Sequence, residues 1–215
     1  YNGMGSYKGA AVAIDCETGG ILAMVSKPDF DPNTVESNWK SLSSSEDSAL
    51  LNRATQGLYP PGSTFKIITA LSYLKNGGKL TDTFDCKGSY TQDGYTIHCY
   101  GGEVHGNQTF KQAFGNSCNV AFSQVGLSLP KGALKSTAQE FYFNKRIPAD
   151  FSNVNKSQFT LKSSDNQAMV MQTAIGQGNT LVTPLHMALI CEALCNDGVL
   201  KTPYVVDHIV NDGGS

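Results

Sequence analysis

The sequence predicts an α+β fold in which an antiparallel sheet is flanked by helices and accompanied by an all-α subdomain. Residues 9–26 hold two β-rich runs separated by turn residues, which is the pattern of a hairpin. Residues 109–143 hold successive helical patterns, and residues 204–210 form another β-rich run. Helices that follow one another between two strand regions are typical of a helical subdomain beside a sheet.

Composition limits the class of protein. The chain has 215 residues, enough for one compact domain or most of a larger one, and 40% are hydrophobic and 16% charged. A formal net charge of −2 without a lysine–arginine cluster indicates neither nucleic acid nor an anionic membrane as a partner. No apolar run approaches the ~20 residues of a membrane span, and no signal peptide is recognisable. Because the chain begins at Tyr1, we expect an excised domain with any membrane anchor outside it.

The N-terminal quarter is expected to hold few elements besides the hairpin. Both hairpin runs are almost wholly apolar, which predicts strands covered on two faces. Residues 27–48 are rich in proline and serine and predict a surface loop, with Trp39 pinning it down. Residues 50–56 predict a short helix.

The middle of the chain alternates between helices and short strands. A helix over residues 63–75 is expected to end at Asn76-Gly77-Gly78. Residues 81–106, rich in Tyr, Thr and Gly, predict strands and turns. Three further helices are expected: one capped by Thr109, one beginning near Ser117, and one over residues 133–143.

The last third is expected to be loop, then helix, then strand. Residues 149–165 are polar and predict a loop, and the glycines of Gly176-Gln177-Gly178 allow a tight backbone. Thr183-Pro184 predicts a helix start and Asn196-Asp197-Gly198 its end. Its core positions are expected at Leu185, Ala188, Leu189 and Leu194. Residues 204–210 predict a strand and residues 211–214 a turn.

The chemistry is expected to centre on Ser63 and Lys66. Pro60-Pro61-Gly62 can start a helix but not continue one, so Ser63 is expected at a helix N-terminus. Residues at i and i+3 share a helix face, which brings the hydroxyl and the amine together. A serine hydroxyl needs a base to become a nucleophile, and burial behind Phe65 and Ile67 would lower the pKa of the lysine amine. The structural alternative is a serine cap beside a surface lysine.

The octet Tyr59-Pro60-Pro61-Gly62-Ser63-Thr64-Phe65-Lys66 resembles the active-site motif of penicillin-binding proteins, the D,D-transpeptidases that cross-link peptidoglycan. Two N-terminal stretches, Gly9-Ala10-Ala11-Val12-Ala13-Ile14-Asp15 and Gly20-Ile21-Leu22-Ala23-Met24-Val25-Ser26, resemble the start of a class B transpeptidase domain. The same resemblance extends to two further stretches, Pro28-Asp29-Phe30-Asp31-Pro32-Asn33 and Asn52-Arg53-Ala54. The resemblance covers most of the chain and implies a DD-peptidase/β-lactamase-like fold with Ser63 as nucleophile and Lys66 as general base.

The second family motif, Ser-x-Asn, fits two places. Ser117-Cys118-Asn119 opens an apolar helix and stands at the family's usual distance from Ser63, so it is preferred. By resemblance, Ser117 relays protons to the leaving group, while Asn119 positions Lys66 and binds the substrate peptide. Ser164-Asp165-Asn166 fits the same pattern but lies in a polar stretch, where such residues more often cap a helix.

The third family motif, Lys-Thr/Ser-Gly, is absent from the sequence. Lys201-Thr202-Pro203 begins in the same way but carries proline in place of glycine, so a linker role is expected. In the family this motif binds the substrate carboxylate, and its strand supplies half of the oxyanion hole. Residues 1–215 are therefore expected to be a transpeptidase domain truncated before that strand, and whether such a chain is active is left open.

The cysteines and histidines suggest weaker alternatives. Cys86 and Cys99 flank an expected hairpin and are the best candidates for a disulfide, but their pairing stays open. A zinc site from Cys86, His98, Cys99 and His105 matches no common ligand spacing, so neither a metal nor another cofactor is expected. Cys191 and Cys195 are expected to be buried in a helix. His186 is expected on a helix surface and His208 in a strand.

The resemblance implies an enzyme that acts outside the cytoplasm, at the cell-wall face of the bacterial plasma membrane. Expected partners are peptidoglycan stem peptides, β-lactam antibiotics and, through the parent protein, other cell-wall synthesis proteins. Two alternatives remain. In a serine β-lactamase water would release the acyl group, and in a β-lactam sensor domain acylation would only signal.

Overall fold

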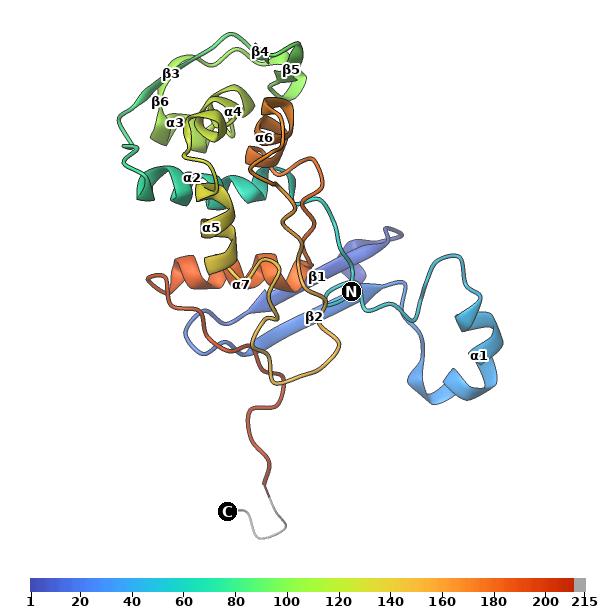
Figure 1. Cartoon of the computed structure of the whole chain (residues 1–215). Helices are drawn as coiled ribbons and strands as arrows, with labels where there is room; N and C mark the ends of the chain where they lie inside the picture. The colour runs from blue at the N-terminus through green and yellow to red at the C-terminus, as the bar shows by residue number, and fades with distance from the viewer. Residues whose placement is uncertain (211–215) are drawn as a thin grey trace. The chain divides into compact units, whose positions relative to one another are not determined.

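The computed structural model describes residues 1–210 and divides into two compact units (Figure 1). The hairpin unit contains residues 1–59 and 146–156 and the described residues from 182 onward. The helical unit contains residues 60–145 and 157–181. Among residues 1–210, every helix is too short or too polar to cross a bilayer.

The hairpin unit is built on the two strands that the sequence predicts. β1 (Gly9–Ile14) pairs antiparallel with β2 (Ile21–Lys27), in a register that runs from Gly9 opposite Lys27 to Ile14 opposite Ile21. In the turn between them, the Asp15 carboxylate accepts hydrogen bonds from the backbone of Glu17 and Thr18. The expectation that both faces are covered is wrong, because residues of β1 alternate between half-buried and exposed and Leu22 is 72% exposed.

Two expectations for the first 60 residues are also wrong. The segment expected to be a loop contains a 3₁₀ turn, Pro32–Thr34, and helix α1 (Val35–Ser43), and Trp39 is 59% exposed rather than buried. Residues 50–56 form turns instead of a helix. Local hydrogen bonds explain these turns, because the Asn52 side chain accepts hydrogen bonds from the backbone of Ala54 and Thr55 and so competes with helical bonding.

Helix α7 (Pro184–Cys195) packs on β1 and begins at the predicted cap, where the Thr183 hydroxyl accepts the backbone N–H of His186. Its buried face matches the prediction at Leu185 and Leu189, whereas Ala188 is only half-buried. The buried residues form one helical stripe at i, i+1, i+4, i+5, i+7 and i+8, namely Leu185, His186, Leu189, Ile190, Glu192 and Ala193. Leu194, Cys191 and Cys195 are exposed on the other side, so the expectations for these residues and for a surface His186 are wrong.

The predicted strand over residues 204–210 does not form. Tyr204 makes a parallel bridge to Gly20, and its carbonyl accepts the backbone N–H of Ile21. Residues 205–210 are exposed and have no regular structure, and His208 lies beside Asp207 in this stretch. The predicted turn at residues 211–214 lies outside the described residues.

The helical unit contains the helices predicted for residues 63–143 and one more. They are α2 (Lys66–Lys75), α3 (Phe110–Gly115), α4 (Asn119–Ser128), α5 (Ala133–Glu140) and α6 (Gln167–Ala174). Thr109 caps α3 in a reciprocal capping box with Gln112. Helix α6 was not predicted, although its start carries a signal: the Asn166 side chain accepts the backbone N–H of Met169.

Two small antiparallel sheets accompany these helices (Figure 1). β3 (Thr83–Cys86) pairs with β6 (Gly106–Thr109), and β4 (Ser89–Gln92) pairs with β5 (Tyr95–His98). The core of the unit joins α2, α3, α4, α6 and β5 through Ala70, Ile97, Phe110, Phe122, Val125, Met171 and Ile175. This packing fixes the relative positions of α2, which begins at Lys66, and α4, which begins at Asn119.

The contact between α4 and α6 depends on a glycine. A methyl group added at Gly126 would lie 2.5 Å from the Ala174 Cβ, whereas one added at Gly115 would meet no atom within 4 Å. Gly126→Ala should lower the free energy of unfolding by about 1–3 kcal/mol through overpacking. Gly115→Ala should change it by no more than about 1 kcal/mol, and in the stabilising direction. Urea denaturation of both variants measures the difference, and equal stability would contradict close α4–α6 packing.

Candidate active site

Ser63 lies in a tight turn that leads into α2. The turn is a 3₁₀ segment, Gly62–Phe65, and Ser63 is exposed within it. Gly62 adopts a φ of +56°, and its N–H donates to the carbonyl of Gly176 at 2.8 Å. A Cβ at Gly176 would lie 1.8 Å from the Gly62 carbonyl oxygen, so glycine is required there. The tight backbone expected at Gly176-Gln177-Gly178 is thus present at Gly176, where it holds the serine turn.

The buried side chain of Phe65 anchors the turn in the core. Its ring is fully buried and packs edge-on against Phe143, with ring centroids 5.6 Å apart. It also stacks on Phe159 at 6.0 Å. Because aromatic packing fixes the backbone on either side of Phe65, the hydroxyl and the amine that flank it have defined directions.

The amine of Lys66 is the centre of the site. Its Nζ lies 3.4 Å from Ser63 Oγ, 3.0 Å from Ser117 Oγ and 2.6 Å from Asn119 Oδ1. It also donates to the Ser117 carbonyl at 2.5 Å. The structure therefore brings together all four residues predicted as the site, from two segments about fifty residues apart.

Burial changes the acid–base chemistry of this amine. Lys66 is 2% exposed, and desolvation lowers its pKa from 10.5 to about 8. The buried thiols of Cys118 and Cys99 act in the opposite direction, because they favour the cation. The net effect leaves a substantial neutral fraction near physiological pH, which a proton acceptor requires.

Ser117 and Asn119 are placed by the start of α4. Ser117 has a φ of +51°, a left-handed conformation that is uncommon outside glycine. Cys118 caps the helix, because its Sγ accepts the backbone N–H of Ala121. The amide of Asn119 donates to the His98 carbonyl at 2.9 Å, which leaves its oxygen turned to Lys66.

The two rival motifs have the features of a helix cap and of a linker. Asp165 accepts the backbone N–H of Lys162, and Asn166 caps α6, so Ser164-Asp165-Asn166 has the capping role that the sequence favours. Lys201-Thr202-Pro203 belongs to the hairpin unit and lies outside regular secondary structure, as expected for a linker.

A pocket of about 260 Å³ opens onto these groups. Its walls include Ser63, Ser117 and Asn119, together with Tyr100, Glu103, His105 and Gln177. Tyr100 and Glu103 were not identified from the sequence, whereas His105 belongs to the zinc set considered there and Gln177 to the stretch Gly176-Gln177-Gly178. Tyr100 is 94% exposed at the pocket edge, and no local pattern distinguishes such a residue from an ordinary surface aromatic.

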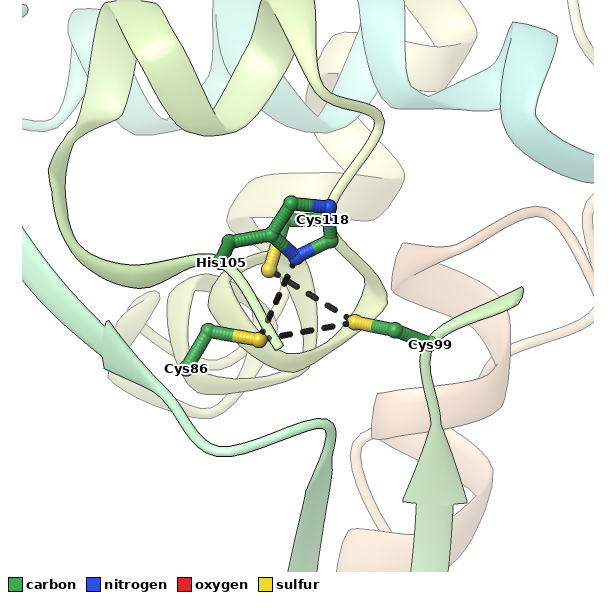
Figure 2. A group of neighbouring side chains, drawn as sticks. All are labelled: Cys86, Cys99, His105 and Cys118. Atoms are coloured by element: carbon green, nitrogen blue, oxygen red, sulfur yellow. Dashed lines mark hydrogen bonds between the residues drawn. The ribbon is translucent and has the colours of Figure 1, made fainter. Parts of the chain in front are cut away.

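A cluster of thiols lies next to the pocket (Figure 2). It contains three members of the weakly supported metal set, Cys86, Cys99 and His105, but Cys118 takes the fourth place instead of His98. The Sγ atoms of Cys86 and Cys99 are 3.6 Å apart, well beyond the ~2.05 Å of a disulfide, and both are free. The sequence prediction missed Cys118 because it stands at the variable position of Ser-x-Asn.

Comparisons with known proteins agree with this geometry. A family model described as the penicillin binding protein transpeptidase domain matches residues 9–214. The peptidoglycan D,D-transpeptidase PbpA of Mycobacterium tuberculosis is 35% identical over 95% of this chain. Stage V sporulation protein D of Bacillus subtilis is 33% identical over 94%. The chain spans 44% of the first relative and 30% of the second.

Solved structures support the same assignment. The ceftriaxone acyl-enzyme complex of penicillin-binding protein A from M. tuberculosis superposes with a TM-score of 0.89 at 32% identity, over 97% of this chain and 49% of that one. The D,D-transpeptidase domain of a peptidoglycan glycosyltransferase from Eggerthella lenta gives 0.89 at 29% identity, over 99% and 55%. The fold, the matched family model and the relatives all agree, and the chain belongs to the penicillin-binding protein transpeptidase family.

Proposed function

We propose that this chain carries the acylation centre of a class B peptidoglycan D,D-transpeptidase, with Ser63 as nucleophile. The observation that carries the proposal is the buried Lys66 amine, which lies within hydrogen-bonding reach of Ser63, Ser117 and Asn119. The names of the relatives support the reaction, because PbpA and MrdA are both peptidoglycan D,D-transpeptidases.

The first half-reaction is an acyl transfer to Ser63. Neutral Lys66 accepts the hydroxyl proton as Ser63 Oγ attacks the carbonyl carbon of a D-Ala-D-Ala peptide bond. The C–N bond then breaks, and the amine of the terminal D-Ala leaves with a proton that Lys66 returns through Ser117. Asn119 holds the lysine amine and hydrogen-bonds the substrate peptide.

The second half-reaction reverses these roles. The amine of a second stem peptide attacks the ester, gives its proton to the Ser117–Lys66 pair, and Ser63 Oγ is reprotonated as it leaves. A β-lactam enters the same first step, but its amine stays tethered to the acyl group after the ring opens, so the ester persists. Acyl-enzyme structures of the mycobacterial relative with ceftriaxone, imipenem and penicillin G support this behaviour.

The names of the relatives also bear on location and partners. Cross-linking of peptidoglycan takes place on the cell-wall side of the plasma membrane, where we place this protein. The complex of penicillin-binding protein 2 with MreC from Helicobacter pylori supports cell-wall synthesis proteins as further partners. The alternatives of a serine β-lactamase and a β-lactam sensor have no comparable support among these relatives.

Fluorescent penicillin tests the nucleophile and the choice between the two Ser-x-Asn motifs. The 215-residue chain should become covalently labelled, and Ser63→Ala should abolish labelling because no oxygen remains to form the ester. Ser117→Ala should slow labelling about 10²- to 10⁴-fold, the usual contribution of a proton-transfer group. Ser164→Ala is the matched control and should label at the wild-type rate. Labelling that survives Ser63→Ala, or that depends on Ser164, would refute the assignment.

The lowered pKa of Lys66 predicts how acylation depends on pH. The base acts in its neutral form, so the second-order labelling rate should rise with pH and level off above a midpoint near 8. An ordinary lysine would place that midpoint near 10.5. Lys66→Arg should remove the pH dependence together with most of the rate, because arginine stays protonated. Stopped labelling reactions between about pH 6 and pH 9 measure the profile, and a flat wild-type profile would contradict the proposed role.

A further inference from the structure

Another pocket lies within the helical unit, where the end of α4, the start of α5 and the segment that leads into α6 meet. We call it the α5 pocket, and it has a volume of about 290 Å³. None of its lining residues also lines the pocket at Ser63. A ligand of the α5 pocket is therefore not an acyl donor to Ser63, and its binding does not depend on the proposed function.

The walls of the α5 pocket are mostly apolar. Leu134 is 4% exposed, and four further apolar side chains of the lining are half-buried, those of Leu127, Leu129, Leu161 and Val170. Leu127 also packs against the core of the helical unit, so the wall continues that core. Transfer of apolar surface out of water is favourable, and these walls can therefore bind an apolar group.

Three lysines line the same pocket. Lys131 and Lys135 come from the start of α5, and Lys162 comes from the segment before α6. All three are exposed, and within residues 1–210 none of their ammonium groups has a carboxylate partner. Three other lysines of the chain each lie beside a carboxylate. The lysines of the α5 pocket are thus free to pair with an anion from solution.

Negative charge in the lining does not balance these lysines. The pocket contains one acidic residue, Asp165, whose carboxylate accepts the backbone N–H of Lys162 at 2.8 Å. The first turn of α5 has no acidic residue, and Gly132 at its cap provides no side-chain oxygen. This positive excess stands in a chain whose formal net charge is −2. Because like charges around one pocket repel, an anion placed among them is stabilised.

The volume of the pocket limits the size of the ligand. A group the size of a water molecule takes about 30 Å³ in a liquid, so about 290 Å³ holds roughly ten non-hydrogen atoms. Pockets for drug-sized molecules usually begin at about 300 Å³. A membrane lipid with two long chains is too large for this space. Octanoate, with eight carbons and two oxygens, matches it.

Three simpler occupants each use only part of the pocket. Water needs two to four polar partners, which a mostly apolar wall does not provide. A small inorganic anion would pair with the lysines but leave the leucine surface in contact with water. A neutral apolar molecule would cover that surface but leave the lysines without an anion.

We propose that the α5 pocket binds a small anionic amphiphile, a molecule with one carboxylate on an unbranched apolar chain of about eight carbons. The chain lies against the leucines and Val170, and the carboxylate lies among Lys131, Lys135 and Lys162. Binding is non-covalent. The ligand is taken up from solution as a free molecule, because the pocket is too small for an intact membrane lipid.

Titration of the 215-residue chain with sodium octanoate, followed by ¹H–¹⁵N nuclear magnetic resonance, tests the site directly. Backbone amide signals of residues 129–135 and 161–167 should shift and saturate, with a Kd of about 10⁻⁴–10⁻³ M, as expected for roughly ten non-hydrogen atoms. Signals of residues 62–63 and 117–119 should not shift. Shifts confined to those residues would place octanoate in the candidate active site and overturn the proposal, as would the absence of saturable shifts up to about 10 mM octanoate.

A ligand series separates the contribution of the chain from that of the charge. From butanoate to octanoate the affinity should rise severalfold with each added methylene, and it should stop rising at decanoate because the cavity is then full. Octanamide, which has the same length but no charge, should bind about three- to tenfold more weakly than octanoate. Equal binding of octanamide, or an affinity that keeps rising through decanoate, would contradict the proposed ligand.

A triple variant tests the three lysines. Lys131→Gln, Lys135→Gln and Lys162→Gln together keep most of each side chain and remove three exposed charges, so the fold should be retained while octanoate binds about three- to tenfold more weakly. The matched control replaces three exposed lysines that do not line the pocket, Lys79, Lys111 and Lys145, by Gln. This control changes the net charge equally and should bind octanoate like the wild type. Equal affinities of the two triple variants would refute the role of the lysines.

Vesicles distinguish a free amphiphile from a membrane surface. The wild type and the triple lysine variant should sediment equally weakly with phosphatidylglycerol vesicles, because an intact lipid does not fit the pocket. Sedimentation that requires the three lysines would assign them to a lipid surface and overturn the proposal. A chain that binds octanoate but is never labelled by fluorescent penicillin would count against the proposed function and not against this site.

Discussion

A single buried ammonium group imposes the arrangement of this site. Lys66 is almost fully removed from water, and a buried amine is costly unless its hydrogen-bonding positions are satisfied. Its acceptors are the Ser63 and Ser117 hydroxyls, the Ser117 carbonyl and the Asn119 amide oxygen. Satisfying one nitrogen thus requires the start of α2 and the start of α4 to meet. These two helix starts are held in place by the cap of α4, the turn at Ser63 and the packing of Phe65.

The part of the site that is local in sequence could be predicted, and the part that depends on tertiary packing could not. Ser63 and Lys66 are three residues apart, so helical geometry alone places them together. Ser117 and Asn119 could be identified only through the family motif, because no local sequence pattern indicates that they contact Lys66. The separation of Cys86 and Cys118 in the sequence matches no known motif. Only the pairing of β3 with β6, together with the start of α4, brings these two residues together.

The fold shows the same division. Strong turn and cap signals gave the β1–β2 hairpin and α7 from sequence. Helices α1 and α6 were missed because both are short, α1 lies in a serine-rich polar stretch, and the apolar residues of α6 do not gather on one face. The face of α7 was misjudged because the residues that cover it, and not its own periodicity, decide which side is buried. Tyr204 begins a pairing with the hairpin that the following residues do not continue.

The contact between Gly62 and Gly176 has a kinetic meaning. The backbone of the serine turn is hydrogen-bonded to a glycine that no other residue could replace without a clash. Ser63 is therefore oriented before any acyl donor arrives, and the conformational freedom of the turn is lost during folding. For a reaction at Ser63, this shifts an entropic cost out of the activation barrier and into the stability of the native state.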